Sequence, residues 1–243
     1  MELESVLEKN RAMHQMMQKA TVDALDVQMA AEQLHQLLQC SVYIMNQSGE
    51  LLGYSDTEAM QLFSRKELDA KQCSKDNQEW MLALRQPVYN QKHNGNYISL
   101  VPVGSASEQM GLLICGRESD TFTDDISLLA EYGATLASVL MIRAASRKAE
   151  TEARKKNVVQ LALEVLSYSE LEAVKYIFSE IDGNEGFLVA SKLAEEYKLT
   201  RSVIVNALRK LESAGVIDAR SLGMKGTYIK ILNDYLYEEL AAI

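Results

Sequence analysis

Hydrophobic positions along the first half of the chain alternate between a helical period and short β-rich runs. Residues 27–38 carry apolar side chains at three- and four-residue steps, which predicts an amphipathic helix. The run "SVYIMN", a turn at residues 47–50 and the run "LLGYS" together predict a hairpin. Two more strands are expected in "YISLVPV" and "GLLICGR", joined by a small polar connector at residues 104–109. Helices before and between these strands indicate an α+β domain with an antiparallel sheet.

A long helical pattern begins near Thr123, a good N-cap residue that is followed by two aspartates suited to a first turn. Six apolar residues are expected to form its buried stripe: Ile126, Leu129, Leu136, Val139, Leu140 and Ile142. The pattern then thins, because residues 144–157 hold few apolar side chains. Glu152 and Lys156 lie there at an i, i+4 spacing that stabilises exposed helices. We therefore predict a helical linker over residues 144–157.

The last third of the chain reads helix, turn, helix, hairpin. A short helix is expected to open near Ala190 and Ser191, and Thr200 caps a second helix after a tight turn. In the second helix the inward stripe consists of Ile204, Ala207, Leu208, Leu211 and Ala214. Two β-branched runs then flank "LGMKGT", a glycine-bracketed turn that suits a hairpin. This order is typical of a winged helix-turn-helix, so we divide the chain into residues 1–143, the linker and residues 158–243.

The outer face of the second helix is polar. With its apolar stripe inward, that face carries Arg201, Ser202, Asn206, Arg209 and Lys210. Residues 198–230 contain seven basic and two acidic side chains, a local net charge of +5, whereas the whole chain has −9. Charges are screened over about 10 Å at ordinary ionic strength, so the acidic remainder need not repel DNA from this segment.

The residue types on this face suit DNA recognition. Arginine and asparagine can read base edges, whereas lysines mostly hold phosphates, so we predict that Arg201 and Asn206 contact bases. Ser202 either contacts DNA or keeps the helix start uncluttered. The full predicted contact set is Ala190, Ser191, Thr200, Arg201, Ser202, Asn206, Arg209, Lys210 and Lys225. The competing interpretation is a helical hairpin whose charged face is merely solvated.

Composition adds few constraints. The chain is 47% hydrophobic and 24% charged, and no uninterrupted apolar run approaches the roughly 18 residues of a membrane span, so we expect a cytoplasmic protein without membrane contact. Three cysteines lie far apart without a C-x-x-C pair, and the histidines show no ligand spacing, so no metal site is predicted. A Cys73 and His93 pair is conceivable but has no orienting motif, and we expect no enzyme activity.

Residues 166–232 carry a resemblance to a known family. The segment "LSYSELEAVKYIFSEIDGNEGFLVASKLAEEYKLTRSVIVNALRKLESAGVIDARSLGMKGTYIKIL" resembles the carboxyl-terminal domain of the CodY family, global nutrient-responsive transcriptional repressors of low-GC Gram-positive bacteria. "LLGYS" and "LLAEYGAT" also resemble that family, in which they belong to a GAF domain joined by a long helix to the winged helix. The resemblance implies a GAF-like effector-sensing and dimerisation domain, a homodimer, an AT-rich, roughly palindromic operator, and a helix-turn-helix over residues 190–209.

The resemblance also implies an effector. Family members respond to branched-chain amino acids (isoleucine, leucine or valine), and some respond to GTP. Arg65 is the counterpart of the family's pocket arginine, although it equally fits a surface position on the charged helix "SRKELDA". The family's aromatic-Pro-Val segment stands here as Gln86, Pro87 and Val88, and residues 54–96 diverge heavily. No G-x-x-x-x-G-K-[ST] loop is present. An effector-modulated regulator and a constitutive dimeric regulator that has lost sensing therefore both stay open.

Overall fold

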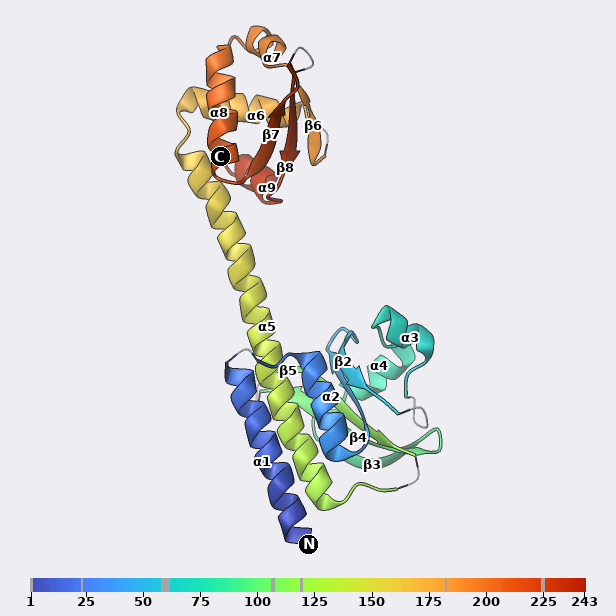
Figure 1. The fold of residues 1–243 in the computed structure, drawn as a ribbon. Helices are drawn as coiled ribbons and strands as arrows, with labels where there is room; N and C mark the ends of the chain where they lie inside the picture. Colours follow the sequence, from blue (N-terminus) through green and yellow to red (C-terminus); the bar gives the residue numbers. More distant parts are fainter. Residues whose placement is uncertain are drawn as a thin grey trace. The chain divides into compact units, whose positions relative to one another are not determined.

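The computed structural model describes residues 2–22, 24–57, 62–105, 108–118, 120–181, 183–223 and 226–243. Packing divides the chain into two compact units, residues 1–146 and 147–243 (Figure 1). One continuous helix, α5 (Asp124–Glu164), contributes residues to both units.

The first unit is built around a five-stranded antiparallel sheet in the order β2-β1-β5-β4-β3. Its strands are β1 (Ser41–Asn46), β2 (Leu51–Ser55), β3 (Val88–His93), β4 (Asn96–Gly104) and β5 (Gln109–Arg117). Helices α1 (Glu2–Thr21) and α2 (Val27–Leu38) and the first part of α5 lie on one face of the sheet (Figure 1). The short helices α3 (Arg65–Ala70) and α4 (Lys75–Leu82) lie on the other face.

Successive side chains along each strand point to opposite faces of the sheet, which produces these two layers. Val42 and Ile44 of β1 join the core beneath α1, α2 and α5, whereas Tyr43 and Met45 point to the α3 and α4 side. The predicted α+β class and antiparallel sheet are confirmed, and α2, β1 and β2 have the predicted bounds. Strand β3 was not predicted. Its sequence "VYNQKH" is largely polar and lacks the apolar alternation that indicates a strand, which an edge strand tolerates because it is less buried than a central one. Its pairing with β4 is also interrupted by a bulge.

The side chains buried along the N-terminal part of α5 differ from the predicted apolar stripe. Ile126, Leu129, Leu136 and Leu140 are buried, but Val139 and Ile142 are 36% and 48% exposed. Small residues take the core-facing positions instead, since a Cβ added to Gly133 would lie 3.1 Å from a methyl carbon of Leu34 in α2. An 18-residue window of α5 is apolar enough to span a membrane, with a mean hydropathy of 1.4, yet 56% of it is buried within the protein. This stretch is a core helix of the first unit.

The second unit is a small helical domain with a three-stranded antiparallel sheet in the order β6-β8-β7. Its elements after α5 are α6 (Tyr168–Ser179), β6 (Glu185–Leu188), α7 (Ala190–Glu196), α8 (Arg201–Ser213), β7 (Ile217–Ser221), β8 (Thr227–Ile231) and α9 (Leu236–Ala241). The predicted helix, turn, helix and hairpin are therefore all present. Strand β6 and helix α9 were not predicted.

Helix α9 contacts the part of α5 that was predicted to be a solvated linker. Lys156 Nζ lies 2.9 Å from a carboxylate oxygen of Glu238 and 3.1 Å from one of Glu239. These bonds raise the pKa of Lys156 to about 12. Glu152 accepts the hydroxyl of Tyr235 at 2.8 Å and pairs with Lys155 at 3.4 Å, in place of the expected Glu152–Lys156 pair. The end of the predicted linker is thus an integral part of the second unit.

Candidate nucleic-acid interface and effector site

Helix α8 is positioned by a capped turn and a buried stripe. Lys198 takes a left-handed conformation with φ of +55°, which lets the Leu199 amide donate back to the Ala194 carbonyl at 2.9 Å. Thr200 then accepts the amide of Val203 at 3.4 Å and starts the helix. On the inner side the buried residues are Ile204, Ala207, Leu208 and Leu211. These contacts hold the opposite face of α8 toward solvent.

The exposed face of α8 carries Arg201, Ser202, Asn206 and Arg209. Thr200 is also exposed, and its hydroxyl lies 3.0 Å from that of Ser202. In α7, Ser191 is exposed and Ala190 is partly buried against the domain core. Lys192 is exposed beside Ser191. It was not among the predicted DNA contacts, although its place in the first helix of the helix-turn-helix could have indicated one. Lys225 lies outside the described residues.

Lys210 differs from the other predicted contacts. Its Nζ donates to a carboxylate oxygen of Glu170 at 2.7 Å and to the carbonyl of Val165 at 3.0 Å. The Glu170 side chain is only 9% exposed, and the Lys210 hydrogen bond together with the Ser167 amide lowers the pKa of Glu170. Lys210 therefore links α8 to the start of α6.

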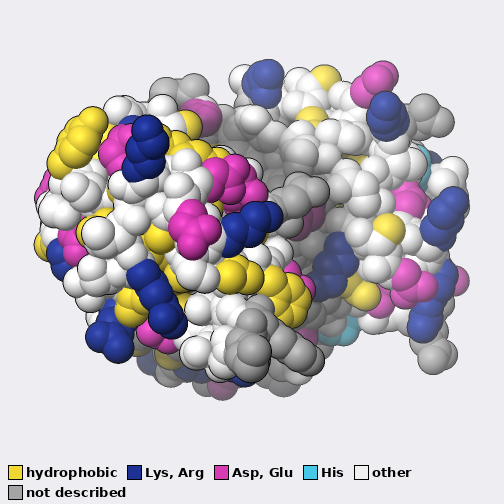
Figure 2. Space-filling model, turned by 90° about the horizontal axis from the view of Figure 1, so that it is seen from above, with side chains coloured by type: hydrophobic (Ala, Val, Ile, Leu, Met, Phe, Trp, Pro, Cys, Tyr) yellow, Lys and Arg dark blue, Asp and Glu magenta, His cyan; other side chains and the backbone are white. Residues whose placement is uncertain are grey.

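A second cation of the basic segment is also paired within the domain. Arg220 Nη2 lies 2.9 Å from Asp218 on the same strand, so less of the local positive charge is free than the sequence count suggests. Figure 2 shows Lys and Arg side chains interspersed with Asp and Glu on the viewed face. Arg201 and Arg209 of α8 are the exposed arginines left for a ligand on that helix.

Comparison with known families finds two domain models of one family along the chain. The CodY helix-turn-helix domain model matches residues 184–242, which contain α7, α8 and both strands of the hairpin. The CodY GAF-like domain model matches residues 5–92 and 75–165. The chain belongs to the CodY family.

Curated CodY relatives match along nearly the whole chain. The global transcriptional regulator CodY of Clostridium beijerinckii is 41% identical over 260 residues, which cover 99% of this chain and 100% of the relative. The protein of the same name from a Thermoanaerobacter species is 41% identical over 249 residues, 98% of each chain. These names agree with the expectation of a regulator and not an enzyme.

Among solved structures, the cofactor-binding GAF domain of the nutrient sensor CodY from Clostridium difficile is similar to part of this chain. It is 22% identical and covers 55% of this chain and 95% of that chain, with a TM-score of 0.41.

The effector residues suggested by the CodY resemblance lie on separate elements. Arg65 is the first residue of α3, its side chain is 87% exposed, and it lies 3.8 Å from Asp69 in an ion pair. Gln86 and Pro87 are exposed before β3, and Val88 begins that strand half-buried. Because Gln86 faces solvent, its amide needs no buried partner.

The space between the sheet and helices α3 and α4 is a hydrophobic core. Tyr43, Phe63, Leu68 and Met81 are buried there, with the Tyr43 and Phe63 rings edge to face at 5.0 Å. The Tyr43 hydroxyl donates to Asp56 at 3.3 Å, and burial raises the pKa of this phenol. This layer stabilises the fold around the sheet.

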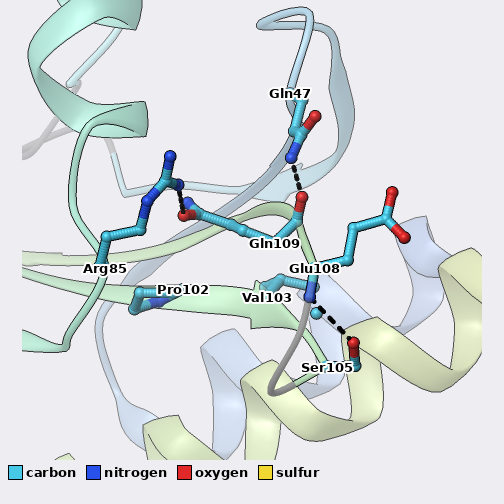
Figure 3. Close-up of a pocket in the computed structure, with 8 residues that line it drawn as sticks. Gln47, Arg85, Pro102, Val103, Ser105, Glu108 and Gln109 are labelled. Atoms are coloured by element: carbon cyan, nitrogen blue, oxygen red, sulfur yellow. Dashed lines mark hydrogen bonds between the residues drawn. The ribbon is translucent and has the colours of Figure 1, made fainter.

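A polar hollow of about 490 Å³ opens at one end of β4 and β5 (Figure 3). Its lining residues are Gln47, Arg85, Pro102, Val103, Gly104, Ser105, Glu108 and Gln109. Arg85 Nη1 donates to the side-chain oxygen of Gln109 at 2.5 Å, and the Gln47 amide donates to the Gln109 backbone carbonyl. The sequence analysis did not single out Arg85 as a residue of a site, although Arg85 directly precedes Gln86. Within the described part of the chain, no group of three or more His, Cys, Asp or Glu could hold a metal ion.

Proposed function

We propose that this CodY-family chain is a DNA-binding transcriptional regulator, mainly a repressor, that binds an AT-rich, roughly palindromic operator. The observation that carries the proposal is the exposed face of α8, where Arg201 and Asn206 project from a helix whose other face is fully buried. A helix presented in this way can enter the major groove with its N-terminal residues against base edges. The CodY relatives bear the name of global transcriptional regulators, which supports the same function.

Within this proposal the contact residues have different roles. Arg201 and Asn206 contact bases, because guanidinium and amide groups match the donor and acceptor pattern of the major groove. Phosphates are held by Arg209 and by the exposed hydroxyls around the two helix starts, Ser191, Thr200 and Ser202. Lys210 is left out of the contact set because its ammonium is bonded to Glu170 and Val165.

We further propose that the protein acts as a homodimer through α5. Leu128, Tyr132, Val139 and Ile142 are large apolar side chains that stay exposed on one face of the helix. Their spacings of four, seven and three residues are those of a coiled-coil seam, so the same face of a second copy could cover them. A dimer also fits a palindromic operator, since each winged helix covers one half-site.

The effector part of the proposal rests on the GAF-like unit. We propose that operator binding responds to a branched-chain amino acid (isoleucine, leucine or valine), with GTP as a second candidate effector. The alternative is a constitutive dimeric regulator, favoured by the divergence of residues 54–96 and by the exposed position of Arg65.

One experiment separates these possibilities. Fluorescence anisotropy would measure the affinity of the full chain for a labelled AT-rich palindrome and for random DNA of equal length, with and without each amino acid or GTP at millimolar concentration. A specific regulator binds the palindrome more tightly than random DNA. Affinity for the palindrome that is unchanged by every ligand would support the constitutive alternative, and equal affinity for both DNAs would refute the operator proposal.

A further inference from the structure

Helix α7 has few contacts of its own that fix its direction. It spans seven residues, Ala190–Glu196, and Leu193 is its buried residue. Its N-cap residue is Val189, whose side chain has no acceptor for the first amides of the helix. A helix this short is not stable by itself, so its direction depends on tertiary contacts at its ends.

The C-terminal end of α7 is attached to α6 by a pair of tyrosines. Tyr197 directly follows α7, and its ring stacks on that of Tyr176 in α6, with centroids 3.9 Å apart and an angle of 19° between the planes. The Tyr197 hydroxyl donates to a carboxylate oxygen of Glu180, the residue that ends α6, at 3.2 Å. Burial and this carboxylate raise the pKa of Tyr197, so the hydroxyl keeps its proton at neutral pH. The ring and the hydroxyl therefore both hold Tyr197 on α6.

The same tyrosine lies three residues before the cap of α8. The turn between the two helices is short and internally bonded. The Tyr197 amide donates to the Leu193 carbonyl at 3.1 Å, and the Leu199 amide donates to the Ala194 carbonyl at 2.9 Å. These bonds leave little freedom between the Tyr197 ring and Thr200, so a displacement of the ring would be transmitted to the first turn of α8.

Helix α8 is in this way attached to α6 at two points. Lys210, in the last turn of α8, bonds to Glu170 in the first turn of α6. Tyr197, just before the first turn of α8, stacks on Tyr176. The buried stripe of α8 determines its rotation about its own axis, while an attachment beside each end determines its tilt over the domain.

We propose that the Tyr176–Tyr197 stack is a determinant of DNA specificity, because it sets the tilt of α8 at which Arg201 and Asn206 reach base edges. This inference rests on the proposed operator binding. Both tyrosines are positioning residues that act through α8. Hydrogen bonds to base edges require correct distances and angles, whereas attraction to phosphates tolerates small displacements. Loss of the stack should therefore reduce discrimination between sequences more than general affinity for DNA.

Anisotropy titrations of the full chain with the palindrome and with random DNA test this role. Tyr197→Leu and Tyr176→Leu should each lower the ratio of the two affinities about tenfold, as expected when a base contact is misplaced, and should change the affinity for random DNA less than about twofold. The double variant should lose no more than either single variant, because all three lack the same contact. Tyr197→Phe keeps the ring and should retain the parent ratio.

Tyr168→Leu is the matched control. Tyr168 is 80% exposed at the start of α6, so its replacement should leave both affinities as in the parent. Circular dichroism melting would identify a temperature at which the variants are folded, and if one leucine variant does not fold, the other tests the same stack.

A purely structural role for the tyrosines predicts a different result. Partial unfolding lowers both affinities by the same factor, since the folded fraction enters each of them equally. Equal losses on both DNAs for the leucine variants, or an unchanged ratio, would overturn the proposal. A loss of ratio in Tyr197→Phe as large as that in Tyr197→Leu would also overturn it, because the bond to Glu180 would then be the positioning contact.

Failure of this inference and failure of operator binding give different results. If the parent prefers the palindrome over random DNA and both leucine variants keep that preference, the inference fails while the operator proposal stands. A parent that binds both DNAs equally overturns the operator proposal and this inference with it.

Discussion

Arg209 and Lys210 are adjacent cations on α8 that serve different purposes. Arg209 faces solvent, whereas Lys210 is bonded to Glu170 and to the Val165 carbonyl. Glu170 also closes a capping box with Ser167, so one carboxylate satisfies the start of α6 and receives the ammonium of α8. A count of basic residues cannot separate these two roles.

Replacing Lys210 with methionine should lower stability without a specific loss of DNA binding. The change leaves Glu170 without its cation and should cost about 1–2 kcal/mol of unfolding free energy at neutral pH, measured by urea denaturation. Since the folded-state pKa of Glu170 is lowered, this contribution is present above the unfolded pKa and is lost as pH falls through the folded value. The difference between parent and variant should therefore shrink below about pH 4.

Arg209→Met is the matched control for that experiment. It should leave stability near that of the parent and weaken DNA binding, because the residue is exposed. A larger loss of stability for Arg209→Met than for Lys210→Met would contradict both assignments.

Base reading can be tested at Arg201 and Asn206. Alanine at either position should cost about 1–3 kcal/mol on the operator and much less on random DNA, measured by anisotropy at fixed salt. The reason is that base contacts discriminate sequence, whereas phosphate contacts act on any DNA. Equal losses on both DNAs for Arg201→Ala would mean that this residue only holds the backbone.

Ser202 reports the orientation of the recognition helix. Its hydroxyl lies next to that of the Thr200 cap, at the exposed start of α8. Ser202→Asp should fold and dimerise normally but lose operator binding at least about tenfold, or about 1.4 kcal/mol, because a carboxylate there would meet DNA phosphates. Ser202→Ala should lose less. Parent-like binding by the aspartate variant would show that this face does not meet DNA.

At the scale of elements, α5 presents different faces to different partners. Its small residues pack on the first unit, while Val139 and Ile142 remain exposed on another face. We expect Ile142→Glu to weaken the dimer, since a charge placed in an apolar seam must be desolvated on association. Analytical ultracentrifugation should show a shift toward monomer and anisotropy a loss of operator affinity. Ala144→Glu, also exposed on α5 but off the seam, should remain dimeric.

At the scale of the whole molecule, the contacts of α9 bear on where an independent DNA-binding unit begins. A fragment of residues 147–243 retains the bonds of Lys156 and Glu152 to α9 and the loop before it, and a fragment of residues 158–243 loses them. The longer fragment should therefore melt at a higher temperature. Both should bind the operator more weakly than the full chain, because neither carries the apolar seam of α5. Identical melting of the two fragments would argue against a structural role for these contacts.

Local signals in the sequence were sufficient for the elements whose interactions are short in range. The Thr200 cap, the apolar stripe of α8 and the glycine-bracketed turn all act within a few residues, so the helix-turn-helix and its hairpin could be predicted directly. The same holds for α2 and the β1–β2 hairpin, where periodicity and a short turn define both elements.

The tertiary structure alone decided which side chains are available for function. Lys210 is engaged by Glu170, 40 residues away, and Arg85 meets Gln109 across 24 residues, so no local pattern could indicate either contact. Val139 and Ile142 fit an apolar helical period whether they face the protein core or a partner chain. Periodicity shows that residues share one face of a helix, but it does not show what packs against that face. Sequence therefore determined the helices and strands themselves, while packing between distant segments determined which cations were compensated and which surfaces were left open.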